Sequence, residues 1–268
     1  MARIRYLALL CADPAALGSF YTSHFGLSEI GRTPDGDVTL TDGGFNLTLF
    51  RNRDALHEPH MGQGIHHLGV AVDNVDAVVA RYRARYPRGT VVAESDDLQH
   101  GQVRIFDPEC HPVTLSQTDF GLPAMPLRVP RIAHLALNAL DTEAILDFYT
   151  DVFGFREVFE AHAHRRNEPG YRNKHVGDGY TNVAIQTFYS GGEEGHEARF
   201  GIAHFGFLVP SSKAKADEVV TGGATVKARP ARRTQSEIRM RDPEGNGCDL
   251  SQRGWEVDSG KWVRADAA

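Results

Sequence analysis

The 268-residue sequence is poor in cysteine, has no long apolar run and carries no excess of basic residues. Its 3 cysteines show no CxxC spacing, which argues against a disulfide framework and against a thiolate zinc site. No apolar stretch approaches the roughly 18 residues of a membrane-spanning helix, and the N-terminus lacks the pattern of a secretion signal. The net charge of −6 and the dispersed Lys and Arg residues argue against nucleic acid or an anionic membrane as a partner. We therefore expect a cytoplasmic protein that binds a small molecule.

The most informative property of the sequence is an internal repeat. Five segments of the first half return in the same order in the second half. They are IRYLAL (4–9), FYTSHFG (20–26), TDGGFNLTLF (41–50), GIHHLGVAV (64–72) and DPECHPVTLSQ (107–117), which return as IAHLAL (132–137), FYTDVFG (148–154), GDGYTNVAIQTF (177–188), GIAHFGFLV (201–209) and DPEGNGCDLSQ (242–252). Five landmarks in one order indicate a duplicated unit.

The repeat predicts two domains with two similar modules in each. The Pro-rich segment 121–130 has no apolar period and separates the copies as a semi-rigid linker, which gives domains 1–123 and 131–268. Within each copy, the order of strand, helix and about three strands occurs twice, so a unit of roughly sixty residues is present four times. Helix boundaries are predicted at Asp13, Gly26, Asp141 and Gly154, with further helices near 74–86 and 211–222.

The two copies differ at three strand positions that bear on chemistry. The repeat pairs Tyr6 with His134, His67 with His204 and Thr114 with Asp249. Two imidazoles and one carboxylate therefore coexist only in the second copy, which predicts a divalent-metal site there. Because side chains alternate along a strand, each of the three candidates shares its face with small residues, as a cavity requires.

Each of these residues also has a simpler interpretation. A single His in a strand usually makes a hydrogen bond or lies at the surface, and Asp249 can be a solvated turn carboxylate. Their joint occurrence at equivalent positions of one repeat favours the ligand interpretation. His67 has Tyr6 and Thr114 as partners and is interpreted as a structural remnant, because one imidazole without a carboxylate holds a divalent ion poorly.

At these residues the chain resembles the vicinal oxygen chelate superfamily, which includes glyoxalase, bleomycin-resistance proteins and type I extradiol dioxygenases. The most recognisable motifs are FYTDVFGF (148–155) and DPEGN (242–246). The resemblance covers nearly the whole chain and implies an α+β fold, with four βαβββ modules paired into two glyoxalase/extradiol-dioxygenase-like domains with cupped mixed sheets. It also implies that the first domain is degenerate and binds no metal, while His134, His204 and Asp249 bind the metal in the second. This arrangement is similar to a two-domain extradiol dioxygenase.

Two departures from the family pattern bear on the expected reaction. Glyoxalase-like sites take a further carboxylate from the strand that corresponds to 181–188, and this strand has no Asp or Glu, which favours a three-ligand site. Where the dioxygenases place an acid–base His and a Tyr, this chain has Thr181 or Asn182 and, on a later strand, Arg233 and Arg239. Asn182 also recurs in the copy without the ligand set, which favours a structural role for it.

Two imidazoles and one carboxylate favour a particular class of substrate. They leave a divalent ion with a net charge near +1 and up to three open positions. Such a centre suits an anionic molecule that chelates through neighbouring oxygens, such as a catecholate, an α-hydroxyketone or an enediolate. Fe(II) is the expected metal and suits oxygen chemistry, whereas Mn(II) or Zn(II) would serve proton transfer or elimination.

Candidate catalytic residues lie in or beside the inserted polar segment and on a late strand. His175 or Tyr180, with His162 and His164 as alternatives, can act as the base, although a solvated loop is the simpler interpretation of each. Arg239 can hold a substrate carboxylate if it faces the cavity, and a surface arginine on an edge strand is the alternative.

Three functions are compatible with these residues. The leading one is a divalent-metal-dependent enzyme acting on a small vicinal-oxygen substrate, most sharply a dioxygenase-like reaction on a catecholic or related aromatic compound. A metal-dependent isomerase or lyase shares the triad and uses no oxygen. A binding protein of the bleomycin-resistance type does not require the triad. Exposed sheet edges also allow a homodimer.

Overall fold

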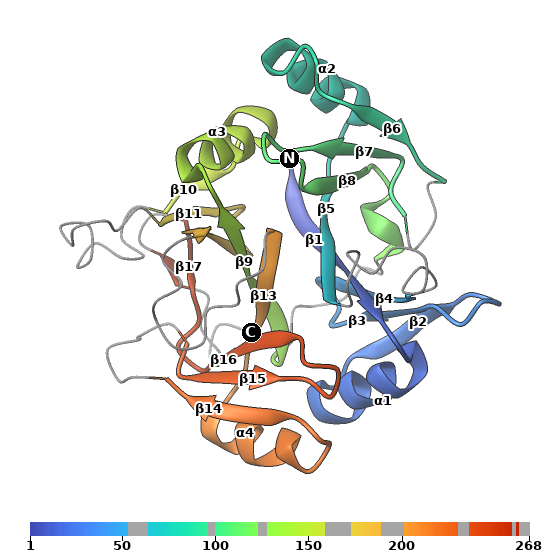
Figure 1. The fold of residues 1–268 in the computed structure, drawn as a ribbon, viewed down its shortest axis with the longest axis vertical. Coiled ribbons are helices and arrows are strands. Elements are labelled where there is room, and N and C mark those ends of the chain that lie inside the picture. The colour runs from blue at the N-terminus through green and yellow to red at the C-terminus, as the bar shows by residue number, and fades with distance from the viewer. Residues whose placement is uncertain are drawn as a thin grey trace.

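The structure is a computed structural model that describes residues 1–52, 64–95, 100–122, 128–158, 173–188, 201–229, 236–258 and 261–262. Within them, each half of the chain forms an eight-stranded sheet that carries two α-helices, and the two halves lie side by side (Figure 1). No helix of these residues has the length and apolar character needed to span a membrane.

The two halves contain the same order of strands and α-helices and differ only after the eighth strand of each half. The first half consists of β1 (Arg3–Cys11), α1 (Pro14–Phe25), β2 (Ser28–Arg32), β3 (Val38–Thr41), β4 (Asn46–Arg51), β5 (Gly64–Ala71), α2 (Val75–Arg85), β6 (Val91–Ala93), β7 (Val103–Phe106), β8 (Pro112–Ser116) and the 3-10 helix η1 (Asp119–Gly121). The second consists of β9 (Arg131–Ala139), α3 (Thr142–Phe153), β10 (Arg156–Glu157), β11 (Lys174–Gly177), β12 (Asn182–Thr187), β13 (Gly201–Leu208), α4 (Ser212–Val220), β14 (Thr225–Ala228), β15 (Ile238–Arg241), β16 (Gly247–Ser251), β17 (Glu256–Asp258) and β18 (Lys261–Trp262).

Strand order confirms the predicted modules. The sheets run β2-β3-β4-β1-β5-β8-β7-β6 and β10-β11-β12-β9-β13-β16-β15-β14. Each module closes with a parallel pair between its first and last strands, and the two modules of a half join through antiparallel first strands. The fold is therefore the expected α+β arrangement of four βαβββ modules in two mixed sheets.

The first helix of each half begins and ends where the sequence predicts. The Asp13 carboxylate accepts hydrogen bonds from the N–H groups at the start of α1, and Asp141 does the same for α3. Gly26 and Gly154 end these helices with φ of 69° and 72°, a conformation that L side chains rarely adopt. Between these boundaries, α1 packs against β3 and β4, and α3 packs in the same way against β11 and β12.

Strand register confirms the equivalence of the two halves. Tyr6 pairs with Asn46 on β4, and His134 pairs with Asn182 on β12. In the same way, Gly69 faces Thr114 and Gly206 faces Asp249. The positions matched by sequence therefore occupy the same places in the two sheets.

The two halves share one hydrophobic core. Helix α1 packs on α4, and α2 packs on α3 (Figure 1). Phe25 at the end of α1 stacks on Phe207 of β13, with 4.0 Å between ring centroids. Most of the buried apolar residues of both halves form one continuous cluster, and two small clusters lie apart from it. The core therefore runs across the boundary between the halves, because a helix of one half covers a strand of the other.

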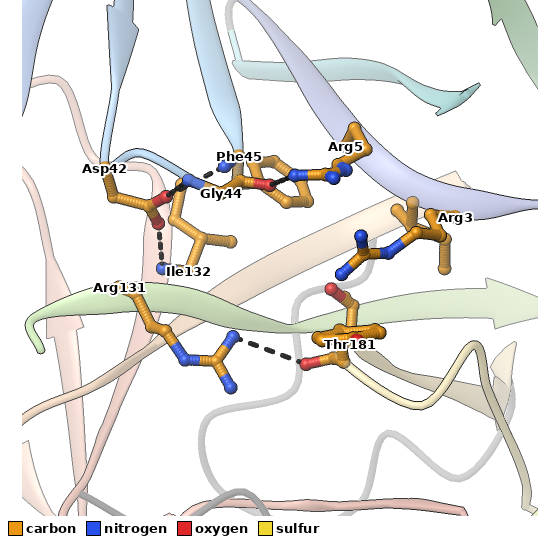
Figure 2. Close-up of a pocket in the computed structure, with 10 residues that line it drawn as sticks. Arg3, Arg5, Asp42, Gly44, Phe45, Arg131, Ile132 and Thr181 are labelled. Carbon is orange, nitrogen blue, oxygen red and sulfur yellow. Dashed lines mark hydrogen bonds between the residues drawn. The ribbon is translucent and has the colours of Figure 1, made fainter. Parts of the chain in front are cut away.

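Reciprocal carboxylates also join the halves. The N–H of Ile132 donates to Asp42 (2.7 Å), and the N–H of Ile4 donates to Asp178 (2.6 Å). Figure 2 shows the first of these bonds in a pocket between the halves. The glutamate of each DPE motif likewise accepts hydrogen bonds from backbone N–H groups of the other half. Glu244 accepts from the N–H groups of Ala12 and Asp13, and Glu109 accepts from those of Leu140 and Asp141.

Asp42 should make stability depend on pH. Burial raises the pKa of Asp42 to about 6, although three backbone N–H groups oppose the shift. The native state therefore binds this proton more tightly than the unfolded chain does, so its contribution to stability falls as the pH rises from about 4 to about 6. We expect the unfolding free energy of the wild type, minus that of Asp42→Asn, to fall by about 2 kcal/mol between pH 4.5 and 7.5. Urea titrations at both pH values measure this, and a difference that does not change with pH would contradict it.

Candidate metal centre

The structure brings the three predicted ligands together. His134 on β9, His204 on β13 and Asp249 on β16 lie on three adjacent strands of the second sheet. All three are buried, and each offers a ligand atom within 4.8 Å of the others. Two ligands about 2.1 Å from one ion are roughly 3 to 4 Å apart. A small inward movement of these side chains would therefore suffice to coordinate one divalent ion.

The protonation states suit metal binding. Burial lowers the pKa of His134 well below its usual range, and burial together with the positive charge of Arg239 lowers the pKa of His204 to about 3. Both rings are therefore neutral at neutral pH. Burial alone would raise the pKa of Asp249, but the positive charges of Arg239 and Arg229 outweigh it, so the pKa lies well below its usual range. The set consists of two neutral imidazoles and one carboxylate, as a divalent metal requires.

Asn182 orients His134. Its Oδ1 atom lies 2.9 Å from Nδ1 of His134 and 3.3 Å from Nδ1 of His175. A carbonyl oxygen only accepts hydrogen bonds, so Nδ1 of His134 carries the proton and Nε2 keeps its lone pair for a metal. The sequence interpretation assigned Asn182 a structural role, and the structure adds a direct contact with a candidate ligand. The equivalent Asn46 instead donates to the carbonyl oxygen of Phe120 (2.8 Å).

Two arginines hold the carboxylate of Asp249. Arg239, which pairs with Asp249 across β15 and β16, places its Nε 2.5 Å from Oδ1. Its Nη2 lies 3.1 Å from Nε2 of His204. Arg229 reaches both carboxylate oxygens with Nη1, at 3.1 and 3.3 Å. Arg239 thus faces the triad, which is one of the two alternatives that the sequence left open, and Arg229 is a contact that sequence analysis missed.

Trp255, which follows β16 in the chain, packs against the site. The sequence analysis did not identify this residue either. Its ring stacks on that of His134, with 4.8 Å between centroids and 3° between planes. Gly206 makes room for it, because a Cβ there would lie 2.8 Å from the indole. In the first half, Phe120 stacks on Tyr6 in the same way. The signal was present in the sequence, since SQTDF (116–120) and SQRGW (251–255) align with an aromatic residue at the end.

Gly206→Ala should weaken metal binding. The added Cβ would lie 2.8 Å from Trp255 and 3.2 Å from Cβ of His134, so the indole must leave its place on the imidazole. We expect a loss of about 1 to 3 kcal/mol in stability and a roughly 10- to 100-fold loss in metal affinity. Gly69→Ala is the matched control, because its Cβ would lie 2.6 Å from Phe120, far from the triad in sequence and sheet. Calorimetric metal titration should show a loss for Gly206→Ala only, and equal affinities would contradict the role of Trp255.

The equivalent place in the first half lacks the ligand set. His67 keeps the imidazole, but Tyr6 and Thr114 stand where the second half has His134 and Asp249. The first module of each half also has a position on its last strand that is equivalent to Asp249. This position is Thr48 on β4, opposite Ala8, and Ala184 on β12, opposite Ala136. Neither position offers a carboxylate, so a site in the second half has three protein ligands from these strands.

The remaining candidates lie in different places. His175 on β11 is buried beside Asn182 and so belongs to the surroundings of the triad. Tyr180 lies elsewhere: the guanidinium of Arg3 lies over its ring, 3.6 Å from the centroid, and both residues line the pocket between the halves. The structure does not bring it to the triad, because the turn before β12 points it toward the first half. His162, His164 and Arg233 lie outside the described residues.

Comparisons with known proteins identify the family and the fold of the chain. The family model described as Glyoxalase/Bleomycin resistance protein/Dioxygenase superfamily matches residues 3–114 and 131–250. No curated protein sequence matches the chain. The structure is similar to that of the 2,3-dioxygenase LapB from Pseudomonas sp. KL28, with a TM-score of 0.66 and 15% identity over 99% of this chain and 98% of that chain.

Two further solved structures have the same fold. The Mn(II)-bound glyoxalase from Novosphingobium aromaticivorans has a TM-score of 0.69 and 19% identity, over 99% of this chain and 86% of that chain. The 2,2',3-trihydroxybiphenyl 1,2-dioxygenase from Sphingomonas wittichii strain RW1 has a TM-score of 0.61 and 16% identity, over 98% and 92%. At such identities the likeness concerns the fold alone. With both halves matched by the family model, the chain belongs to the glyoxalase/bleomycin resistance protein/dioxygenase superfamily.

Proposed function

We propose that the chain is a divalent-metal-dependent enzyme that acts on a small molecule with two neighbouring oxygens, with Fe(II) as its metal. The observation that carries this proposal is the buried triad of His134, His204 and Asp249, whose donor atoms lie within 4.8 Å of one another. When bound there, a divalent ion supplies Lewis-acid stabilisation of negative charge on the vicinal oxygens. The sharpest version is a dioxygenase-like reaction on a catecholic or related aromatic compound.

The charges around the triad favour an anionic substrate. Arg239 and Arg229 act on Asp249 as positive groups, and both of their side chains are 9% exposed. Two guanidinium groups and a divalent ion outweigh the single carboxylate of Asp249. A catecholate or an aromatic carboxylate would offset this excess in a buried place, where charge interactions are strong. We therefore assign Arg239 the role of binding an anionic group of the substrate.

His175 is the proposed proton acceptor. It is buried and shares the Oδ1 atom of Asn182 with His134, which places it beside the triad. Burial lowers the pKa of His175 to about 4, opposed by its hydrogen bond to Asn182, so the ring is neutral at neutral pH. A base with this pKa accepts a proton only from an acidic group, such as a hydroxyl activated by a metal.

A second candidate is an isomerase or lyase reaction without oxygen. The observation that favours it is Arg239, which faces the triad at the position where the dioxygenases have a Tyr, as the family resemblance implies. A guanidinium can stabilise an enediolate but does not donate a proton at neutral pH. Mn(II) or Zn(II) would serve such a reaction, and one of the similar structures is an Mn(II)-bound glyoxalase.

Anaerobic loading with Fe(II) tests the first candidate. A panel of catechols and hydroxylated aromatic acids is added, and oxygen uptake is followed together with the yellow absorbance of ring-opened products. Uptake with product formation should disappear in Asp249→Ala and persist in His67→Ala, which lies in the half without the ligand set. His175→Ala should lower turnover while metal content stays at the wild-type level.

The alternatives give different results in the same assay. Turnover of a dicarbonyl or hydroxyacid with Mn(II) or Zn(II), without oxygen uptake, would replace the dioxygenase with an isomerase or lyase. Tight ligand binding that chelators do not change, with no turnover under either condition, would leave a binding protein of the bleomycin-resistance type.

A further inference from the structure

Arg239 contacts the same atoms that a metal would use. Its Nη2 lies 3.1 Å from Nε2 of His204, and its Nε lies 2.5 Å from Oδ1 of Asp249. Nε2 of His204 and Oδ2 of Asp249 are themselves 3.4 Å apart. That separation is close to the roughly 3 Å expected for two neighbouring ligands of one ion. The guanidinium therefore joins two of the three candidate ligands.

The contact with His204 shows which lone pair is in use. A guanidinium only donates hydrogen bonds, so Nε2 of His204 must accept from Arg239. The lone pair that accepts is the one that would bind a metal. An ion on Nε2 of His204 would therefore have to replace Nη2 of Arg239, because the single lone pair of this nitrogen has one partner at a time.

We propose that Arg239 is an internal competitor of the metal: it pairs with His204 and Asp249 in the metal-free protein and leaves them when a divalent ion binds. The inference rests on the metal centre proposed above and concerns its loading. Arg229 has a different role, because its described contacts in the triad are with Asp249 alone. It can keep these contacts while an ion binds the carboxylate, because a carboxylate offers more lone pairs than Arg229 uses.

The burial of Asp249 gives this arrangement a physical reason. The residue is 2% exposed, and an ionised carboxylate without a partner is strongly destabilising at such a place. Arg239 supplies a cation when no metal is bound, so the apo-protein keeps its fold. The same pairing lowers metal affinity, because its hydrogen bonds must break before the ion can bind.

The first half contains a matched arginine. Arg104 pairs with Thr114 across β7 and β8, as Arg239 pairs with Asp249 across β15 and β16. Its Nη2 binds Oε1 of Glu94 at 2.6 Å. Arg104 thus has the same place in its sheet, the same kind of carboxylate partner and no complete ligand set beside it. Arg104→Gln is the control for a general effect of removing an arginine from this place in a sheet.

Co(II) is a suitable probe, because its affinity is measured by equilibrium dialysis and its visible spectrum reports the ligands. We expect Arg239→Gln and Arg239→Met to bind Co(II) at least tenfold more tightly than the wild type, since neither side chain neutralises Asp249. Arg104→Gln should bind it with wild-type affinity. Without metal, the two Arg239 variants should melt at a lower temperature than the wild type, and saturating Co(II) should raise their melting temperature by more.

The outcomes separate this inference from the proposed function. Equal or weaker Co(II) binding by both Arg239 variants would overturn the competition. An equal gain in affinity in Arg104→Gln would also overturn it, since the effect would then be one of overall charge. No Co(II) binding by any of the proteins would overturn the competition together with the metal centre. A tenfold gain confined to the Arg239 variants would support the competition even if no substrate is turned over, in which case only the enzymatic proposal fails.

Discussion

Asp249→Ala is expected to abolish metal binding at concentrations where the wild type holds about one divalent ion per chain. The variant loses the only carboxylate of the triad. In the wild type, the guanidinium groups of Arg239 and Arg229 pair with this carboxylate. In the variant, these two positive groups remain near the imidazoles without it. Loss of a residue that merely supports a ligand costs roughly 10- to 100-fold in affinity, so the loss of a charged ligand should cost more than about 100-fold.

His134→Ala and His204→Ala should have a similar but smaller effect, because each removes a neutral ligand and leaves Asp249 in place. His67→Ala is the matched control, since it removes the imidazole at the equivalent place of the first half. Metal analysis after dialysis against a weak chelator measures occupancy. Normal occupancy in the three triad variants, or an equal loss in His67→Ala, would remove the site from these residues.

Phe25→Ala is expected to destabilise both halves of the protein. Phe25 is 1% exposed and stacks on Phe207 of the other half, which is fully buried. Truncating a buried Phe to Ala costs about 3 to 5 kcal/mol, because transfer and cavity terms add. Since the two halves share one core, a change on α1 should shift the urea midpoint of Trp fluorescence, to which Trp255 in the second half contributes.

A double-mutant cycle isolates the contact between the halves. Phe207→Ala should cost about as much as Phe25→Ala, and the double variant should cost about 1 kcal/mol less than their sum, because the stacked pair is lost only once. Circular dichroism and Trp fluorescence should give one common transition in all four proteins. A fluorescence midpoint that stays at the wild-type value in Phe25→Ala would mean that the halves unfold independently.

Local rules made much of the fold predictable. Asp13 and Gly26 bound α1 through capping and a left-handed turn, which depend on neighbours in the sequence. The repeat then transferred each strand assignment from one half to the other. The repeat also made Thr114 and Asp249 equivalent, and the structure agrees because each pairs with the equivalent glycine, Gly69 or Gly206.

The sequence by itself determined which half of the chain holds two imidazoles and a carboxylate at equivalent strand positions, because residue type and period-two alternation are local properties. Only the tertiary structure decided what surrounds them. Arg239 pairs with Asp249 and His204 through the directions of buried side chains. The alternation of side chains along a strand does not specify these directions. Tyr180 contacts Arg3 because the two halves pack against each other, and this packing is fixed by shape and burial between segments far apart in the sequence.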